Sequence, residues 1–271
     1  MLDITPIAAF DTNYIWLLIN RDKQEAIAID TGDATVVQNF LQQNQIKLQA
    51  IWITHHHHDH TGGVLQLVKQ NPDVQIFAHK NHGLTDKIAQ KNLTLIDENI
   101  PITAWEYAVK VWQTFGHTDS HLSFLLQVGN KQVGNKIHVF CGDTLFAAGC
   151  GRVFTGTIEQ LFASFQRFNA LATDTLFYPA HEYTLQNLEF ANFILPNDNN
   201  IKQALKNYAQ LQKINKPTLP TTLANERQIN VFLQALNPSD DLSLAVQQKT
   251  NISDNQPLTI FAALRKLKNN F

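Results

Sequence analysis

A histidine-rich segment in the first quarter of the chain is the clearest sign of chemistry. Residues 55–60 comprise five histidines and one aspartate, and they directly follow the apolar stretch Ala50–Ile53. Imidazole is the commonest metal ligand among protein side chains at neutral pH. Together with a carboxylate it suits zinc, iron or manganese rather than calcium or copper(I). The segment therefore predicts a transition-metal site.

The spacing inside this segment decides which side chains can act together. Just past the end of a strand the side chains still alternate, so His55 and His57 are expected on one side. Asp59 and His60 follow at a turn that Gly62–Gly63 helps to close. The spacing predicts one imidazole pair for a first ion and an Asp–His pair for a second.

Two other interpretations of the segment stay open. In a helix, His56 and His60 would share a face, as in zinc proteases of the HExxH type. The general-base glutamate of those enzymes would fall at position 57, which is histidine here. Alternatively, the segment is a solvated polyhistidine loop that binds metal incidentally. Ligand candidates elsewhere in the chain favour the strand–loop interpretation over both.

Three further metal-competent residues each follow a short apolar run. They are His117, Asp143 and His181. Open α/β sheets place their ligand sites outside the carboxyl ends of the strands. We therefore expect these three side chains to converge with the first cluster at one edge of a sheet.

The chain up to about residue 182 alternates short strand-like runs with helical stretches, which indicates two packed sheets with helices outside. The strand candidates are 14–19, 26–30, 50–54, 74–78, 109–114, 123–128 and 137–142. Residues 129–136 predict the turn of a hairpin. The helix candidates are 34–43, 63–70 and 157–172, the last with the capping-box spacing of Thr157 and Gln160.

The character of the sequence changes after Tyr183, because glycine disappears and Gln, Asn, Leu and Ala dominate. The helix candidates there are 185–195, 199–214, 224–236, 239–249 and 257–268. We therefore predict a catalytic domain at 1–182 and a helical domain at 183–271.

The overall composition excludes several classes of partner. The chain has 21 basic and 23 acidic side chains, so neither nucleic acid nor an anionic membrane is an evident partner. No apolar run approaches the length of a membrane span, and the first residues lack the features of a signal peptide. Cys141 and Cys150 indicate small packing residues rather than a disulfide framework. A cytoplasmic location is the expectation, and the oligomeric state has no readable signal.

The sequence resembles the metallo-β-lactamase superfamily and, within it, the glyoxalase II (hydroxyacylglutathione hydrolase) family. The matching segments span essentially the whole chain: 13–16, 54–63, 116–118, 142–152, 181–184 and 264–271. The resemblance implies an α/β fold, the αββα sandwich of the superfamily, with a C-terminal helical domain. It also implies two divalent metal ions, with zinc preferred and iron or manganese fitting the same donors. His55, His57 and His117 would bind the first ion, and Asp59, His60 and His181 the second, with Asp143 bridging both.

The implied reaction is hydrolysis of S-2-hydroxyacylglutathione, chiefly S-D-lactoylglutathione, to glutathione and D-lactate by hydroxide held between the two ions. This would be the second step of methylglyoxal detoxification. Asp59 and Asp143 would be the catalytic carboxylates, because Asp59 could also orient the nucleophile. The leaving thiolate is weakly basic, so no strong general acid is required.

The resemblance also implies which side chains bind the glutathione moiety, and these are Arg152, Phe154, Tyr183, Arg265 and Lys268. Related enzymes often have Tyr where this chain has Phe154, so one hydroxyl contact would be absent. From the residues alone, Arg265 and Lys268 also suit a basic helix end that complements its own dipole.

The main alternative function is that of a glutathione-persulfide dioxygenase, which shares the fold but uses a single iron. The complete second set, Asp59, His60 and His181, argues against it. A β-lactamase is disfavoured by the absence of an export signal, and a nuclease by the balanced charge. A non-catalytic metal-binding protein is a remote third class.

Overall fold

The computed structural model describes residues 1–98, 100–130 and 134–271 of the chain. These residues form two compact units. The first unit comprises Met1–Thr114 and Ser120–Gly142, and the second comprises Phe115–Asp119 and Asp143–Phe271.

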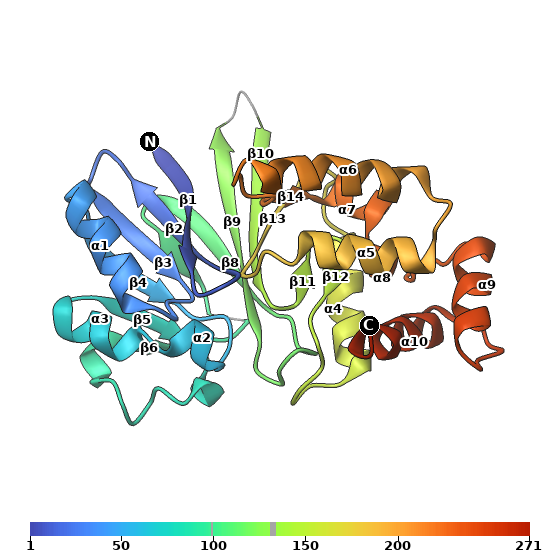
Figure 1. The fold of residues 1–271 in the computed structure, drawn as a ribbon. Coiled ribbons are helices and arrows are strands. Elements are labelled where there is room, and N and C mark those ends of the chain that lie inside the picture. The colour runs from blue at the N-terminus through green and yellow to red at the C-terminus, as the bar shows by residue number, and fades with distance from the viewer. Residues whose placement is uncertain (99, 131–133) are drawn as a thin grey trace. The chain divides into compact units, whose positions relative to one another are not determined.

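The first unit contains a mixed sheet in the order β1-β2-β3-β4-β5-β6. Its strands are β1 (Leu2–Ala9), β2 (Asn13–Asn20), β3 (Glu25–Ile29), β4 (Lys47–Trp52), β5 (Gln75–Ala78) and β6 (Leu93–Leu95). Strands β1 to β3 pair antiparallel, whereas β3 to β6 pair parallel. Helices α1 (Ala34–Asn44) and α3 (Val64–Gln70) make parallel crossovers, and their apolar faces join the core of the sheet (Figure 1).

An antiparallel sheet in the same unit runs in the order β10-β9-β8-β7. Its strands are β7 (Ile102–Ala104), β8 (Tyr107–Gln113), β9 (Leu122–Asn130) and β10 (Gly134–Gly142). Trp52 of β4 packs on Phe124 of β9 with ring centroids 5.1 Å apart, so the two sheets share a buried interior. The hairpin predicted around residues 129–136 is present as the β9–β10 pair, and residues 131–133 of its turn lie outside the described residues.

The second unit is mainly helical. Its helices are α4 (Ile158–Asn169), α5 (Thr184–Ile194), α6 (Asn199–Lys213), α7 (Leu223–Ile229), α8 (Val231–Gln234), α9 (Asp240–Lys249) and α10 (Pro257–Asn269). Its short strand pairs are β11 (Leu145–Phe146) with β12 (Gly149–Cys150) and β13 (Leu176–Pro179) with β14 (Thr221–Thr222). Buried phenylalanines fill its core, as the contacts of Phe261 with Phe165 and Phe232 show. The predicted capping box of α4 is confirmed.

The structure corrects one helix. The sequence predicts a single helix at 224–236, but the chain breaks at Asn230, whose backbone is extended (φ −97°, ψ 103°). The Asn230 side chain accepts a hydrogen bond from Phe232 N–H and so caps the new helix α8. Asn favours cap positions because its side chain can hydrogen-bond nearby backbone groups. Helical periodicity alone does not reveal the break.

In the first unit, the strands β1, β6 and β7 were not predicted, and neither were the short strands β11 to β14 of the second unit. β1 is an edge strand that contains Pro6, and its residues are mostly half-buried, so it lacks the alternation that marks a strand in a sequence. β6 and β7 have three residues each, too few to show a period. Over the described residues, no helix has the length and apolar character needed to cross a membrane.

Candidate metal centre

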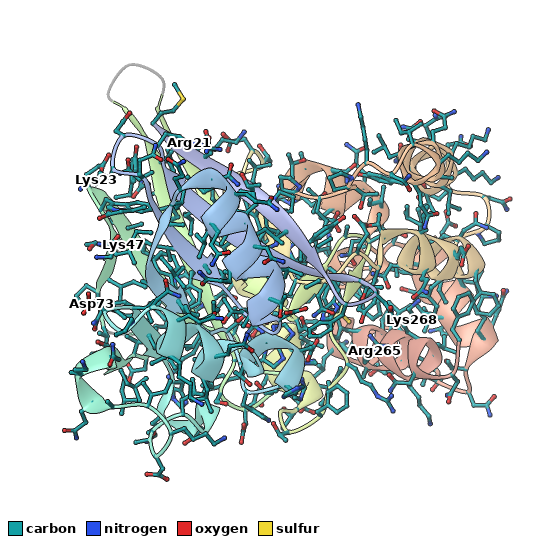
Figure 2. All side chains as sticks on the ribbon, turned by 60° about the vertical axis from the view of Figure 1, so that its left-hand side comes forward. Arg21, Lys23, Lys47, Asp73, Arg265 and Lys268 are labelled. Atoms are coloured by element: carbon teal, nitrogen blue, oxygen red, sulfur yellow. The ribbon has the colours of Figure 1, made fainter. Side chains whose placement is uncertain are left out.

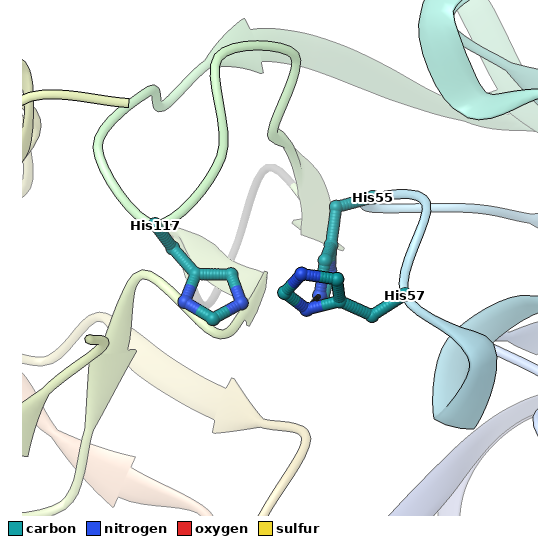
Figure 3. Close-up of side chains that lie close together, drawn as sticks. All are labelled: His55, His57 and His117. Carbon is teal, nitrogen blue, oxygen red and sulfur yellow. Dashed lines mark hydrogen bonds between the residues drawn. The ribbon is translucent and has the colours of Figure 1, made fainter. Parts of the chain in front are cut away.

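The loop that follows β4 carries the first two predicted ligands. Thr54 anchors this loop, because the Asp30 carboxylate accepts from Thr54 N–H (2.8 Å) and from its hydroxyl (2.7 Å). The Thr54 hydroxyl also lies 3.0 Å from Nδ1 of His55, which turns the other ring nitrogen, Nε2, to within 3.0 Å of His57 Nδ1. Figure 3 shows His55 and His57 on this loop, and His117 on the loop that leaves β8. The two imidazoles after β4 thus present nitrogen atoms to one point.

Asp59 and His60 lie in a short helix, α2 (His58–Thr61), rather than in the turn that the sequence predicted. His60 is fully buried, with Nδ1 3.0 Å from Asp30 Oδ2 and Nε2 3.4 Å from Asp59 Oδ2. The Asn13 amide donates to Asp59 Oδ2 at 3.0 Å. The HExxH alternative is wrong, because α2 begins at His58 and His56 lies outside it.

His121 packs behind the first pair. Its ring stacks on His55 with centroids 5.0 Å apart, and its Nδ1 lies 3.1 Å from the Thr114 hydroxyl. Gly142, at φ 48°, leaves no room for a Cβ, which would collide with the Thr54 hydroxyl and the His121 ring. His121 therefore supports His55 through packing.

The second unit carries the other three predicted ligands. His117 Nδ1 donates to the Arg152 carbonyl at 2.7 Å, and its Nε2 lies 3.6 Å from Asp143 Oδ2. His181, which follows β13, has its Nε2 3.4 Å from the same carboxylate oxygen and stacks on Tyr183. The three side chains are at least nine-tenths buried. Asp143 Oδ2 thus faces two imidazole nitrogens.

The spacing of the donors in both units suits bound cations. Ligands that are each about 2.1 Å from a tetrahedral ion lie about 3.4 Å from one another. The pairs described above are separated by 3.0 to 3.6 Å. Several of the imidazoles are also oriented through their second nitrogen by a hydroxyl, a carboxylate or a carbonyl, as metal-binding histidines usually are. The donor set fits zinc, iron or manganese.

Two predicted substrate contacts, Arg152 and Phe154, lie beside His117. The Arg152 guanidinium stands over the Phe154 ring, 5.6 Å from its centroid. Phe154 in turn contacts the His117 ring edge-on (5.3 Å) and is 57 % exposed. An exposed cation and an exposed ring thus adjoin a predicted ligand.

Two further predicted contacts, Arg265 and Lys268, share one face of α10 (Figure 2). Arg265 is buried, and its Nη1 donates to the Cys150 carbonyl at 2.9 Å. Lys268 Nζ donates to the Gln186 carbonyl at 3.0 Å. Desolvation, with the nearby Arg265 charge, lowers the pKa of Lys268 to about 8. Both side chains reach carbonyl groups outside α10, so neither serves only the dipole of its own helix.

Sequence reasoning missed the supporting role of Asp30. This carboxylate directly follows an apolar strand, as the predicted ligands do, so the same signal marks it. Asn13 gave no such signal, because an amide near the start of a strand is common on protein surfaces.

Comparisons with known proteins identify the family to which this chain belongs. The family model described as "Metallo-beta-lactamase superfamily" matches residues 10–181, and "Hydroxyacylglutathione hydrolase C-terminus" matches residues 182–271. A hydroxyacylglutathione hydrolase of Neisseria meningitidis is 44% identical over 271 residues, covering 100% of this chain and 99% of the relative.

Solved structures share the fold at low sequence identity. ETHE1 from Myxococcus xanthus superposes with a TM-score of 0.60 at 22% identity, covering 99% of this chain and 98% of that one. TTHA1623, solved in a di-iron-bound form, gives a TM-score of 0.56 at 21% identity and covers 84% of this chain and 100% of that one. The predicted metallo-β-lactamase fold with a C-terminal helical region is confirmed. The chain belongs to the hydroxyacylglutathione hydrolase family of the metallo-β-lactamase superfamily.

Proposed function

We propose that this chain is a metal-dependent thioester hydrolase that cleaves S-2-hydroxyacylglutathione, chiefly S-D-lactoylglutathione, to glutathione and D-lactate. The observation that supports the proposal is the presence of candidate ligand groups for two ions in a chain whose full-length relative bears this activity in its name. Such a reaction would be the second step of methylglyoxal detoxification.

The two ligand sets would combine into one dinuclear centre. The candidate groups are His55 with His57 and His117, and Asp59 with His60 and His181. Asp143, whose carboxylate faces two imidazoles, would bridge the ions. Zinc is the metal we propose, and iron or manganese fits the same donors. When bound, such ions supply hydroxide near neutral pH, by lowering the pKa of water to about 7, and polarise the thioester carbonyl.

The contacts of Asp59 support its proposed catalytic role. The Asn13 amide fixes one oxygen of Asp59, so that its carboxylate can accept a hydrogen bond from the attacking nucleophile and orient it. The leaving group is a thiolate, which departs without a strong general acid. This set of residues therefore suits a thioester better than an amide.

The glutathione moiety carries two carboxylates, which call for fixed cations. Arg152 and Lys268 would supply them, together with Arg265, whose Nε and Nη1 also make protein contacts. Phe154 would pack on the peptide, and Tyr183, stacked on His181, would donate its hydroxyl. In this assignment residues 1–182 carry the chemistry and 183–271 contribute substrate contacts. A cytoplasmic location stays a prediction.

Thiol release and metal content together test the proposal. Purified protein is given S-D-lactoylglutathione while free thiol, oxygen uptake and bound metals are measured. We expect stoichiometric thiol release, two metal ions per chain and no oxygen uptake. A single iron with oxygen consumption would instead identify the dioxygenase activity. Tight metal binding without thiol release would identify a non-catalytic metal-binding protein, and either result would contradict the proposal.

A further inference from the structure

The segment that joins Asp143 to Arg152 is a closed hairpin. Strands β11 and β12 pair inside it, and Gly151 N–H donates to the Thr144 carbonyl at 3.1 Å. Asp143 precedes the hairpin, and Arg152 follows it with the carbonyl that accepts from His117 Nδ1. The position of the hairpin therefore sets the positions of both Asp143 and His117.

Side chains from four regions of the helical part hold the tip of this hairpin. Each of the four consecutive residues 147–150 forms a hydrogen bond with a different one of them. We call these four side chains the polar clamp: Asn187 of α5 donates to the Ala147 carbonyl (3.0 Å), Glu226 of α7 accepts from Ala148 N–H (2.8 Å), Asn230 before α8 donates to the Gly149 carbonyl (3.0 Å), and Arg265 of α10 donates to the Cys150 carbonyl (2.9 Å).

The hairpin tip is shaped to fit this clamp. Ala148 has φ 55°, a left-handed conformation that is uncommon for a residue with a Cβ. A Cβ at position 149 would collide with the Asn187 amide, so only glycine allows that approach. Backbone conformations of this kind persist where the surroundings hold them in place. The clamp provides those surroundings.

Glu226 is the central member of the clamp. It is fully buried, and its Oε2 accepts from both Ala148 N–H and the Asn230 amide (2.9 Å), while Oε1 accepts from the Thr221 hydroxyl (2.8 Å). Ala148 N–H and the Asn230 amide group can only donate, so Oε2 is needed as an acceptor, while the Thr221 hydroxyl accepts from the Asn225 amide (3.0 Å) and turns its hydrogen toward Oε1. A glutamine at this position would turn its own N–H groups toward at least one donor and leave it unsatisfied.

We propose that Glu226 is a positioning residue that holds Asp143 and His117 in their metal-binding arrangement through the β11–β12 hairpin. The helical region thereby builds part of the metal centre in addition to contacting substrate. The inference rests on the proposed function for the ligand roles of Asp143 and His117, and its test measures metal binding rather than turnover.

The test compares Glu226→Gln with a matched variant, Arg227→Met. Arg227 neighbours Glu226 on α7 and donates two hydrogen bonds to Asn169, but none to the hairpin. Zinc affinity is measured by competition with a chromogenic chelator, and amide hydrogen exchange is followed over residues 144–151. We expect Glu226→Gln to bind zinc at least tenfold more weakly and to lose protection at Ala148, while Arg227→Met keeps both properties within twofold of the unmodified chain.

Wild-type zinc affinity in Glu226→Gln would overturn the inference, and so would equal losses in the two variants, which indicate general destabilisation. If Glu226→Gln does not fold, Asn187→Ala removes a single clamp hydrogen bond and is judged by the same criteria. The two proposals can fail separately. If the wild-type chain has no thioesterase activity but Glu226→Gln still loses zinc affinity as expected, the proposed function is refuted and the positioning role of Glu226 is supported.

Discussion

At the scale of residues, several candidate ligands are oriented by a neighbouring group that contacts their second ring nitrogen. Asp30 serves both Thr54 and His60, and the Arg152 carbonyl serves His117. Orientation through the second ring nitrogen selects the tautomer that leaves the other nitrogen available for a metal. The orientation of the candidate ligands therefore depends on partner groups that the spacing of the ligands in the sequence does not reveal.

Among the candidate ligands, Asp143 should be the most sensitive to substitution, because its carboxylate faces both His117 and His181. Asp143→Asn keeps the shape but removes the negative charge that would be shared between two cations. We expect loss of bound metal together with a drop in kcat/KM of a hundredfold or more, about 3 kcal/mol. Elemental analysis and thiol-release kinetics measure both. Asp174→Asn, on the surface, is the control, and unchanged metal content in Asp143→Asn would contradict the bridging role.

Phe154 occupies a position where related enzymes often have Tyr, and a substitution there tests this departure. Phe154→Tyr adds a hydroxyl to an exposed ring beside Arg152 and His117. One neutral hydrogen bond is worth about 1 kcal/mol, so we expect KM for S-lactoylglutathione to fall about fivefold with little change in kcat. Phe193→Tyr, at another exposed phenylalanine, should leave KM unchanged. An unaltered KM in Phe154→Tyr would show that no substrate group lies within reach of the new hydroxyl.

At the scale of elements, α10 places two cations on one face, where both contact the rest of the fold and are proposed to bind substrate. Arg265 donates a hydrogen bond to the Cys150 carbonyl in β12, and Lys268 donates one to the Gln186 carbonyl in α5. The aromatic rings of Phe190 and Phe271 lie under the Lys268 ammonium. These surroundings withdraw Lys268 from water and account for its lowered pKa. The helix therefore carries a cation, Lys268, whose charge changes within the pH range in which enzymes are usually assayed.

The pKa of about 8 for Lys268 predicts a pH-dependent KM. Lys268 is charged below this value and loses its charge as pH rises through it, so attraction for a glutathione carboxylate should weaken. We expect KM to rise severalfold between pH 7 and 9 in the unmodified chain. In Lys268→Met, KM should be higher at pH 7 and nearly flat across the range. Lys266→Met, an exposed lysine on the same helix, should keep the unmodified profile, and a steep profile in Lys268→Met would refute the assignment.

At the scale of the whole molecule, candidate ligands come from both compact units and from sequence positions between 55 and 181. A ligand that binds only the folded chain stabilises it by mass action. At a hundredfold excess over its dissociation constant, one ion contributes about 2.7 kcal/mol.

Metal removal should therefore lower thermal stability. A change of that size shifts Tm by about 5–10 °C in a chain of this length. We expect chelator-treated protein to melt lower by that amount and to recover on addition of zinc but not of magnesium. Calorimetry of the Asp143→Asn variant provides the comparison, since its Tm should respond little to either treatment. Equal melting of the treated and untreated unmodified protein would argue against metal ions that link folding to binding.

Much of the fold was predictable because local patterns carry it. The seven predicted strands and most helices follow from apolar runs and caps such as Thr157 with Gln160. The break at Asn230 was not predictable, because it depends on a side chain that caps one helix and donates a hydrogen bond to the distant Gly149 carbonyl. Edge strand β1 was missed for a related reason, since its pairing partner rather than its own pattern defines it.

The sequence by itself determined the candidate ligands, since residue type and position after an apolar run are local properties of the chain. Only the tertiary structure decided what holds them. Asn13 reaches Asp59 across 46 positions, Glu226 reaches Ala148 across 78 and Arg265 reaches Cys150 across 115. Hydrogen bonds over such separations form only after the core has brought the elements together, so no spacing rule in the sequence can anticipate them.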